Sequence, residues 1–324
     1  MITLSTLRLG LILLVMVASI SSLATILVGV SAAPAPGQSA SQGEKFTFAV
    51  IGDYGWEGQA EADVARLVRG WRPDLVITTG DNNYSDGASS TIDKNIGQYY
   101  ASFIAPYNGR FGPGATGNHF FPSLGNHDWE RAGARPYLAY FTLPGNERYY
   151  DFTSGPVQFF ALDSDIREPD GITVDSRQAE WLRAKLETSN SAWRVVYLHH
   201  PPFSSGIHGN TLATQWPYED WGSTAVLAGH DHSYERLQLG GIPYFVNGLG
   251  GAPSYGFLGV VEGSRKRYAA GHGAMLVQAQ GNVITYSFYT TKNVRVDTFR
   301  QCREREWGPG IEGCLAGAWG GRTR

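Results

Sequence analysis

Side chains that can bind metal ions follow five apolar stretches of this 324-residue chain, and each stretch ends at a glycine or a tight turn. An apolar stretch of this kind predicts a buried strand, and the functional groups of α/β proteins gather beyond the carboxyl ends of strands. A single Gly-Asp is a common turn, but five such segments in order predict one shared site. They read IGDYG (51–55), TGDNNY (79–84), LGNHD (124–128), VYLHH (196–200) and AGHDH (228–232).

The five segments supply oxygen and nitrogen donors and no thiolate, a set that suits hard and borderline metal ions. Glycine before a donor removes a Cβ and lets the backbone bring carboxylates close together. In an extended segment, residues i and i+2 project to the same side. We therefore expect His230 and His232 both to face the site, while Asp231 points away. The donors are Asp53, Asp81, Tyr84, Asn126, His199, His230 and His232.

The elements that must position these donors alternate between strand and helix. Residues 58–71 have the spacing of an amphipathic helix, and Asp175 with Gln178 predicts a capping box at the start of another. Residues 242–299 show no helical pattern and predict hairpins, one with its turn at Gly281-Asn282. This order predicts an α/β fold in which sheets pack between helices. Strands are expected at 46–52, 74–80, 156–164, 193–200 and 223–230.

The first 33 residues stand apart from this pattern. Arg8 precedes an apolar run over residues 9–30, and small residues follow up to Ala33, which is typical of an export signal. The run is also close to the ~20 residues that span a bilayer, so an uncleaved N-terminal anchor is the alternative. In both cases we expect the rest of the chain outside the cytosol, whether secreted, periplasmic or otherwise extracytoplasmic. Residues 34–45 predict a linker, and residues 46–300 predict a single catalytic domain.

The net charge of the chain limits the classes of partner that it is expected to bind. The net charge of −3 provides no strong field for nucleic acid or anionic lipid, so neither is expected, and membrane contact is expected only if the N-terminal segment stays uncleaved. No segment specifies an oligomeric state. The tail over residues 301–324 holds both cysteines of the chain, Cys302 and Cys314. An even pair in an exported protein predicts a disulfide, with two free thiols as the alternative.

The order of the motifs D-x-G, GD-x-x-Y, GNH-D, V-x-x-H and GH-x-H resembles that of the purple acid phosphatases, within the calcineurin-like metallophosphoesterases. Every motif is present, and together they cover residues 46–235. The resemblance implies an α/β fold with two mixed β-sheets sandwiched between helices, in αββα layers. It also implies two metal ions that share Asp81. One ion would be bound by Asp53, Asp81, Tyr84 and His232, and the other by Asp81, Asn126, His199 and His230.

The identity of the two metals follows from the charge of these ligands. Many relatives have a histidine where this chain has Gly55, and Tyr84 would fill that place as a phenolate. A free tyrosine has a pKa of about 10, so only a strongly acidic cation ionises it near neutral pH. Two aspartates, the phenolate and a hydroxide carry four negative charges, so a trivalent and a divalent ion leave a net charge that suits a phosphate dianion. The expected pair is Fe(III) with Fe(II), Zn(II) or Mn(II).

The resemblance implies an exported acid phosphatase, in which a metal-activated hydroxide attacks a small phosphate monoester and phosphate is released. His127 and His208 match histidines of the family outside the ligand set, and each either orients the substrate or donates a proton to the leaving group. His200 is expected to pack behind the ligands. Asp128 either orients His127 or caps a turn.

Two other functions compete with this hypothesis. A phosphodiesterase or nucleotide pyrophosphatase would use the same ions, and aromatic residues of the loops 85–120 and 203–220 would then stack on the substrate. Packing within the loops is the favoured alternative for these residues, which are Tyr99, Tyr100, Phe103, Tyr107, Trp216 and Tyr218. A non-catalytic exported module that binds phosphate groups would be indicated by a missing ligand, and none is missing.

Overall fold

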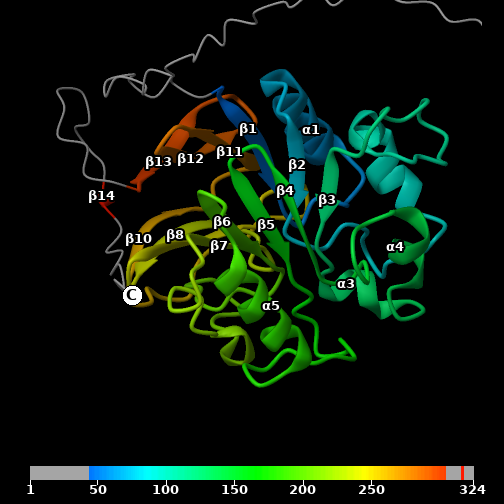
Figure 1. Cartoon of the computed structure of the whole chain (residues 1–324). Coiled ribbons are helices and arrows are strands. Elements are labelled where there is room, and N and C mark those ends of the chain that lie inside the picture. Colours follow the sequence, from blue (N-terminus) through cyan, green and yellow to red (C-terminus); the bar gives the residue numbers. More distant parts are fainter. Residues whose placement is uncertain (1–43, 304–314, 317–324) are drawn as a thin grey trace, which may run out of the picture. The chain divides into compact units, whose positions relative to one another are not determined.

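The computed structural model describes residues 44–303 and 315–316 (Figure 1). Contacts divide the chain into two units, Met1–Ser41 and Gln42–Arg324, and all described residues belong to the second. The predicted leader (1–33) lies outside the described residues, as does the predicted linker (34–45) except for its last two residues. Cys314 also lies outside them, so its disulfide with Cys302 stays a prediction.

The first sheet has seven strands and is mixed. Its parallel side runs from β1 (Phe46–Ile51) through β2 (Leu75–Thr78) to β3 (Phe120–Pro122). On the other side of β1, the strands β11 (Gly273–Gln280), β12 (Val283–Thr290) and β13 (Arg295–Cys302) follow one another antiparallel. The short β14 (Leu315–Ala316) pairs in parallel with β13. The carboxyl ends of β1 and β2 therefore meet at one edge.

The second sheet also has seven strands and is mixed. At its centre β5 (Val157–Ala161), β6 (Trp193–Tyr197), β7 (Ala225–Ala228) and β9 (Ile242–Asn247) are parallel. Antiparallel strands complete both sides: β4 (Tyr150–Ser154) beside β5, and β8 (Tyr234–Leu239) with β10 (Ser264–Tyr268) beside β9. Here too the carboxyl ends of the parallel strands share one edge of the sheet.

Two long helices accompany the sheets, and shorter ones lie in the connections. The long helices are α1 (Gln59–Trp71) and α5 (Arg177–Thr188). The connections hold a π-helical turn (Asp93–Gly97), α2 (Gln98–Tyr100), 3₁₀ turns (Ala101–Phe103 and Leu212–Thr214), α3 (Asn126–Glu130) and α4 (Arg135–Tyr140). None of the helices within residues 44–303 is long and apolar enough to cross a bilayer.

The two sheets pack face to face through aromatic side chains. Phe48 of β1 lies 4.9 Å from Phe159 of β5, and Tyr234 of β8 lies 4.3 Å from Phe288 of β12, measured between ring centroids. Because side chains alternate along a strand, Phe160 faces the other way and joins a separate core with Leu182 and Leu186 of α5. In Figure 1, α5 lies beside the second sheet and α1 beside the first. The predicted layered fold of two mixed sheets between helices is confirmed.

The predicted elements are present, with one error at a helix start. Strands β1, β2, β5, β6 and β7, helix α1 and the β11–β12 hairpin lie where they were expected. The predicted capping box at Asp175 is wrong, because the side chain of Ser176 caps α5 by accepting from the Ala179 N–H at 3.2 Å. Gln178 is instead buried, where it exchanges hydrogen bonds with the backbone of Asp163.

Candidate metal centre

Three of the predicted donors leave their strands through the same kind of turn. Asp53, Asp81 and His230 follow β1, β2 and β7, each directly after a glycine, with φ values of 54°, 53° and 68°. Left-handed backbone is uncommon for residues other than glycine and concentrates at functional sites. A Cβ on Gly229 would lie 2.5 Å from Asp53 Oδ2, so this turn needs glycine to approach its neighbour. The turns thus bring donors from both sheets together.

Three donors surround the buried hydroxyl group of Tyr84. Its oxygen lies 2.9 Å from Asp81 Oδ2, 3.3 Å from Asp53 Oδ1 and 3.1 Å from His232 Nε2. His232 Nε2 is also 3.4 Å from Asp53 Oδ1. One phenolic proton can satisfy only one of these acceptors, so the remaining lone pairs converge with no hydrogen between them. We call Asp53, Tyr84 and His232 the anionic half of the site.

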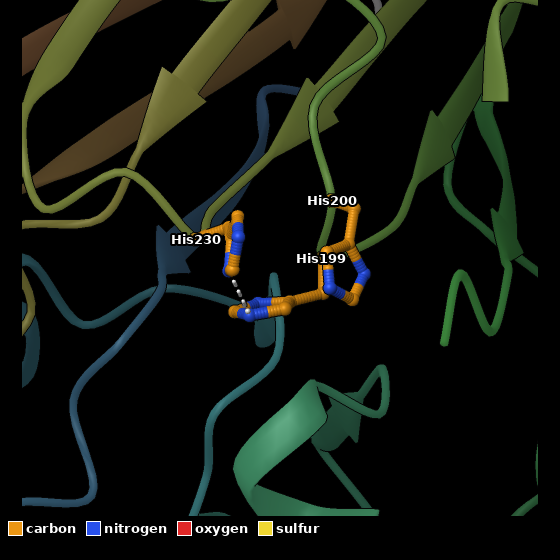
Figure 2. Close-up of side chains that lie close together, drawn as sticks. All are labelled: His199, His200 and His230. Atoms are coloured by element: carbon orange, nitrogen blue, oxygen red, sulfur yellow. Dashed lines mark hydrogen bonds between the residues drawn. The ribbon is translucent and has the colours of Figure 1, made fainter. Parts of the chain in front are cut away.

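A second group of donors surrounds the imidazole of His199. Its Nε2 lies 3.0 Å from Asn126 Oδ1 and 3.2 Å from His230 Nδ1, and Figure 2 shows these two imidazoles directed toward each other. The same Nε2 is 3.4 Å from Asp81 Oδ1. We call Asn126, His199 and His230 the neutral half of the site. Asp81 presents one carboxylate oxygen to each half.

Backbone carbonyl groups orient two of the imidazoles. His199 Nδ1 lies 2.8 Å from Thr79 O, and His232 Nδ1 lies 2.8 Å from Pro253 O. A carbonyl oxygen only accepts, so each Nδ1 carries a proton and each Nε2 can direct a lone pair into the site. A second hydrogen bond of this kind is how proteins fix the tautomer of a metal-binding histidine.

The carboxylates of the site shift the pKa values of two neighbouring side chains in the direction that favours bound positive charge. Burial by itself lowers the pKa of His199, but the carboxylates of Asp81 and Asp53 outweigh it and raise that pKa to about 10. Burial and the nearby His199 lower the pKa of His230. Burial together with Asp81 and Asp53 raises the pKa of Tyr84 well above its ordinary value. Binding of metal ions would displace the proton on His199 and supply the positive charge that these carboxylates attract. The donor types and their convergence therefore fit two metal ions.

The two predicted non-ligand histidines lie beside different halves of this site. The ring of His127 is 4.5 Å from that of Tyr84, and its Nε2 is 3.9 Å from Asp81 Oδ2. The ring of His208 is 4.2 Å from that of His230. Asp128 settles the alternative left open by the sequence, because it accepts from the Gly125 N–H at 2.9 Å and caps α3. Burial and Asp81 raise the pKa of Asp128 to about 7.

His230 and His232 both face the site, but the expected reason is wrong. The segment is a turn and not an extended strand, because His230 has a φ of 68°. The side chains diverge toward different halves, His230 to His199 and His232 to Tyr84. Asp231 points away from the metal-capable atoms, as predicted, and contacts Ser204 and His208 instead.

Two further residues at the site, Trp56 and Tyr255, escaped the motifs, whereas a third, His200, was expected there. His200 packs against a predicted ligand, as expected, because its ring lies 4.4 Å from that of His230 (Figure 2). Its Nδ1 is 3.0 Å from Ser164 Oγ. Tyr255 stacks on His232 at 4.7 Å and donates to His230 O. Trp56 lies 5.3 Å from the Tyr84 ring and is 45% exposed. Its position three residues after Asp53 was a usable signal, whereas Tyr255 belongs to no motif.

The aromatic residues of the two long loops pack, as the favoured alternative stated. Tyr99, Tyr100, Trp216 and Tyr218 are buried. Phe103 and Tyr107 are partly buried against the central core. The aromatic rings beside the site come from other segments, namely Trp56, which contacts Tyr84, and Tyr255, which contacts His232.

Comparisons of sequence place the chain among known proteins. The profile of the family described as Calcineurin-like phosphoesterase matches residues 46–234. Purple acid phosphatase 17 of Arabidopsis thaliana is 26% identical over 223 residues, which cover 59% of this chain and 63% of that protein. Tartrate-resistant acid phosphatase type 5 of Homo sapiens is 24% identical over 247 residues, which cover 63% of this chain and 72% of that protein.

Solved structures share the fold at lower sequence identity. A purple acid phosphatase from yellow lupin seeds has a TM-score of 0.67 at 16% identity, covering 87% of this chain and 58% of that one. GAP50, the anchor in the inner membrane complex of Plasmodium, has a TM-score of 0.62 at 16% identity, covering 81% of this chain and 90% of that one. Identity this low shows a common fold alone.

Proposed function

This chain belongs to the calcineurin-like phosphoesterase family, and from that premise we propose that it hydrolyses phosphate monoesters at a site for two metal ions, as a purple acid phosphatase does. The observation that carries the proposal is the convergence of seven donors into two sets that share Asp81. Its shared carboxylate suits the close spacing of ions in two-metal hydrolases.

In this proposal the anionic half and Asp81 hold a trivalent ion, Fe(III), and the neutral half and Asp81 hold Fe(II), Zn(II) or Mn(II). The support is the charge of each half, together with the raised pKa of Tyr84, which only a strongly acidic cation would overcome. When bound, the two ions lower the pKa of water and hold the phosphoryl oxygens. Elemental analysis is expected to find iron with a second metal, and the visible spectrum a tyrosinate-to-iron band.

In this proposal His127 and His208 act on the substrate and not on the metal ions. During hydrolysis phosphorus gains a bond to a water oxygen, while the ester oxygen leaves with the electron pair of its broken bond and takes up a proton. His208 and His127 lie beside the two halves and are the candidates to orient the phosphoryl group or to supply that proton. Replacing either by alanine is expected to slow esters with poor leaving groups more than p-nitrophenyl phosphate.

Rates on p-nitrophenyl phosphate and on bis(p-nitrophenyl) phosphate test the substrate class. A faster rate on the monoester supports an acid phosphatase, and a faster rate on the diester supports the phosphodiesterase or pyrophosphatase alternative. GAP50 is described as an anchor, so a protein that binds two metals and turns over neither ester would support a non-catalytic role. The Asp86→Asn variant, at an exposed ion pair with Arg131, is the control for substitution near the site.

We also propose that the protein is exported, because an apolar run and small residues occupy the predicted leader. N-terminal sequencing of protein from a fractionated cell distinguishes a cleaved leader from an anchor. A full-length chain in the cytosolic fraction would contradict export.

A further inference from the structure

The aspartate between His230 and His232 has a buried carboxylate that points away from the metal-capable atoms. Asp231 is 0% exposed. Its Oδ1 accepts a hydrogen bond from the His208 N–H at 3.0 Å, and its Oδ2 accepts from the Ser204 hydroxyl. No cation of the described residues pairs with it. Burying a carboxylate in this way is costly unless its hydrogen bonds compensate, so these contacts define what Asp231 does.

The contacts of Asp231 hold the segment 204–208, which carries His208. The Ser204 hydroxyl, which donates to Asp231, also accepts from the Gly206 N–H at 2.9 Å. A Cβ on Gly206 would lie 2.1 Å from Asp231 Cγ, so the backbone passes directly over the carboxylate. The segment is therefore wrapped around one side chain, and its last residue is His208.

We propose that Asp231 is a positioning residue that fixes His208 against the metal site by ordering residues 204–208. Its neighbours in sequence, His230 and His232, take part in the two halves of the site. One turn therefore sets both the donors and the distance of 4.2 Å between the rings of His208 and His230. The inference rests on the proposed function, because only in that function does His208 orient the phosphoryl group or protonate the leaving group.

The same segment supplies a matched control. Glu235 is also a buried carboxylate, and it accepts hydrogen bonds from the N–H and hydroxyl of Ser205 at 2.7 and 2.6 Å. It also accepts from Ser264, but it does not contact His208. A Glu235→Gln variant therefore perturbs the same loop through a buried acid without removing the bond to His208.

Hydrogen exchange of the metal-free protein tests, independently of activity, whether Asp231 orders residues 204–208. In Asp231→Ala the amides of residues 204–208 are expected to exchange about tenfold faster, because a charge-assisted hydrogen bond is lost. Asp231→Asn keeps one acceptor and is expected to lie between the wild type and Asp231→Ala. Unchanged exchange in Asp231→Ala overturns the inference.

Activity with two substrates then separates positioning from general loss of structure. The variants Asp231→Ala, His208→Ala, their double variant and Glu235→Gln are loaded with metal and compared at equal metal content. Rates are measured on p-nitrophenyl phosphate and on glycerol 2-phosphate, whose alkoxide leaves less readily. Asp231→Ala is expected to lose about tenfold more rate on the alkyl ester than on the aryl ester, as His208→Ala does. Glu235→Gln is expected to keep the wild-type ratio.

The double variant gives the deciding comparison. If Asp231 acts through His208, the double variant loses no more rate than His208→Ala alone. Losses that add, or an unchanged ratio in Asp231→Ala beside a changed one in His208→Ala, overturn the inference and leave the proposed function standing. If wild-type protein loaded with metal turns over neither ester, the proposed function fails and the inference fails with it.

Discussion

The two halves of the metal site differ in charge and in the side chains that surround them. The anionic half combines Asp53 and Tyr84 with a single imidazole; its Tyr84 lies beside the ring of Trp56, and its His232 beside that of Tyr255. The neutral half combines an amide with two imidazoles, and its His199 is fully buried. Asp81 alone contributes to both. The difference teaches that one cluster of donors can be divided into two unequal sets when a single carboxylate lies between contrasting neighbours.

The largest effect is expected when the shared residue is changed. Asp81→Asn removes a negative charge from both halves, so metal content and turnover should both collapse, with turnover falling on the order of 10³-fold or more. Elemental analysis and the rate on p-nitrophenyl phosphate measure this. Asp86→Asn should behave like the wild type. If Asp81→Asn kept both metals, the sharing of Asp81 would be refuted.

A change confined to the neutral half should separate turnover from colour. Asn126→Ala removes an oxygen that lies 3.0 Å from His199 Nε2, so we expect turnover to fall on the order of 10²–10³-fold. The visible band should remain, because Tyr84 and its neighbours are untouched. Loss of the band together with activity would show that the halves do not act separately, and near wild-type turnover would contradict the proposed mechanism.

A change confined to the anionic half should remove the visible band and affect turnover less. Tyr84→Phe removes the only phenol among the proposed ligands, and its visible band should disappear while the second metal stays bound. We expect a smaller loss of turnover than in Asn126→Ala, about tenfold, because Asp53 and the shared Asp81 still supply carboxylates to this half. A band that persists in Tyr84→Phe would exclude the assignment of iron to this half.

The smallest effect concerns a buried carboxyl group that, unlike Asp81, has no partner. Glu61 in α1 is fully buried, and neither of its oxygens has a hydrogen-bond partner among the described residues. Burial, and to a lesser degree Glu57, raises the pKa of Glu61 well above its ordinary value. Its contribution to stability is therefore fully present below the pKa of the unfolded chain and is lost as pH rises through the folded pKa. This residue makes the protein more stable at acid pH.

Replacing Glu61 by glutamine should flatten that pH dependence. Urea unfolding at about pH 4.5 and pH 7 should show a smaller loss of stability in Glu61→Gln than in the wild type, by up to about 1.4 kcal/mol per pH unit. Metal content should not change, because Glu61 is not a donor. Glu187→Gln, at an exposed ion pair with Arg183, is the control. An identical pH dependence in wild type and Glu61→Gln would show that the raised pKa has no effect on folding.

Much of the fold was predictable because its signals are local. Apolar runs predicted β1, β2, β5, β6 and β7, with a glycine after β1, β2 and β7, and period-3.6 spacing predicted α1. The cap of α5 was misplaced by one residue, because Asp175 and Ser176 are both good caps in sequence. The choice depended on Gln178, whose burial against Asp163 fixes where the helix starts.

The sequence by itself determined the types and order of the donors, because five strand ends, each at a glycine or a tight turn, leave a recognisable segment. The family resemblance implied how these donors divide, and only the tertiary structure shows the contacts that group them. The left-handed turn at His230 sends neighbouring histidines to different halves, and the meeting of both sheets places Asp53 beside His232. It also brought Tyr255 to the site and tied Asp231 to His208. Such contacts join residues far apart in the chain or depend on backbone geometry, and neither leaves a mark in local composition.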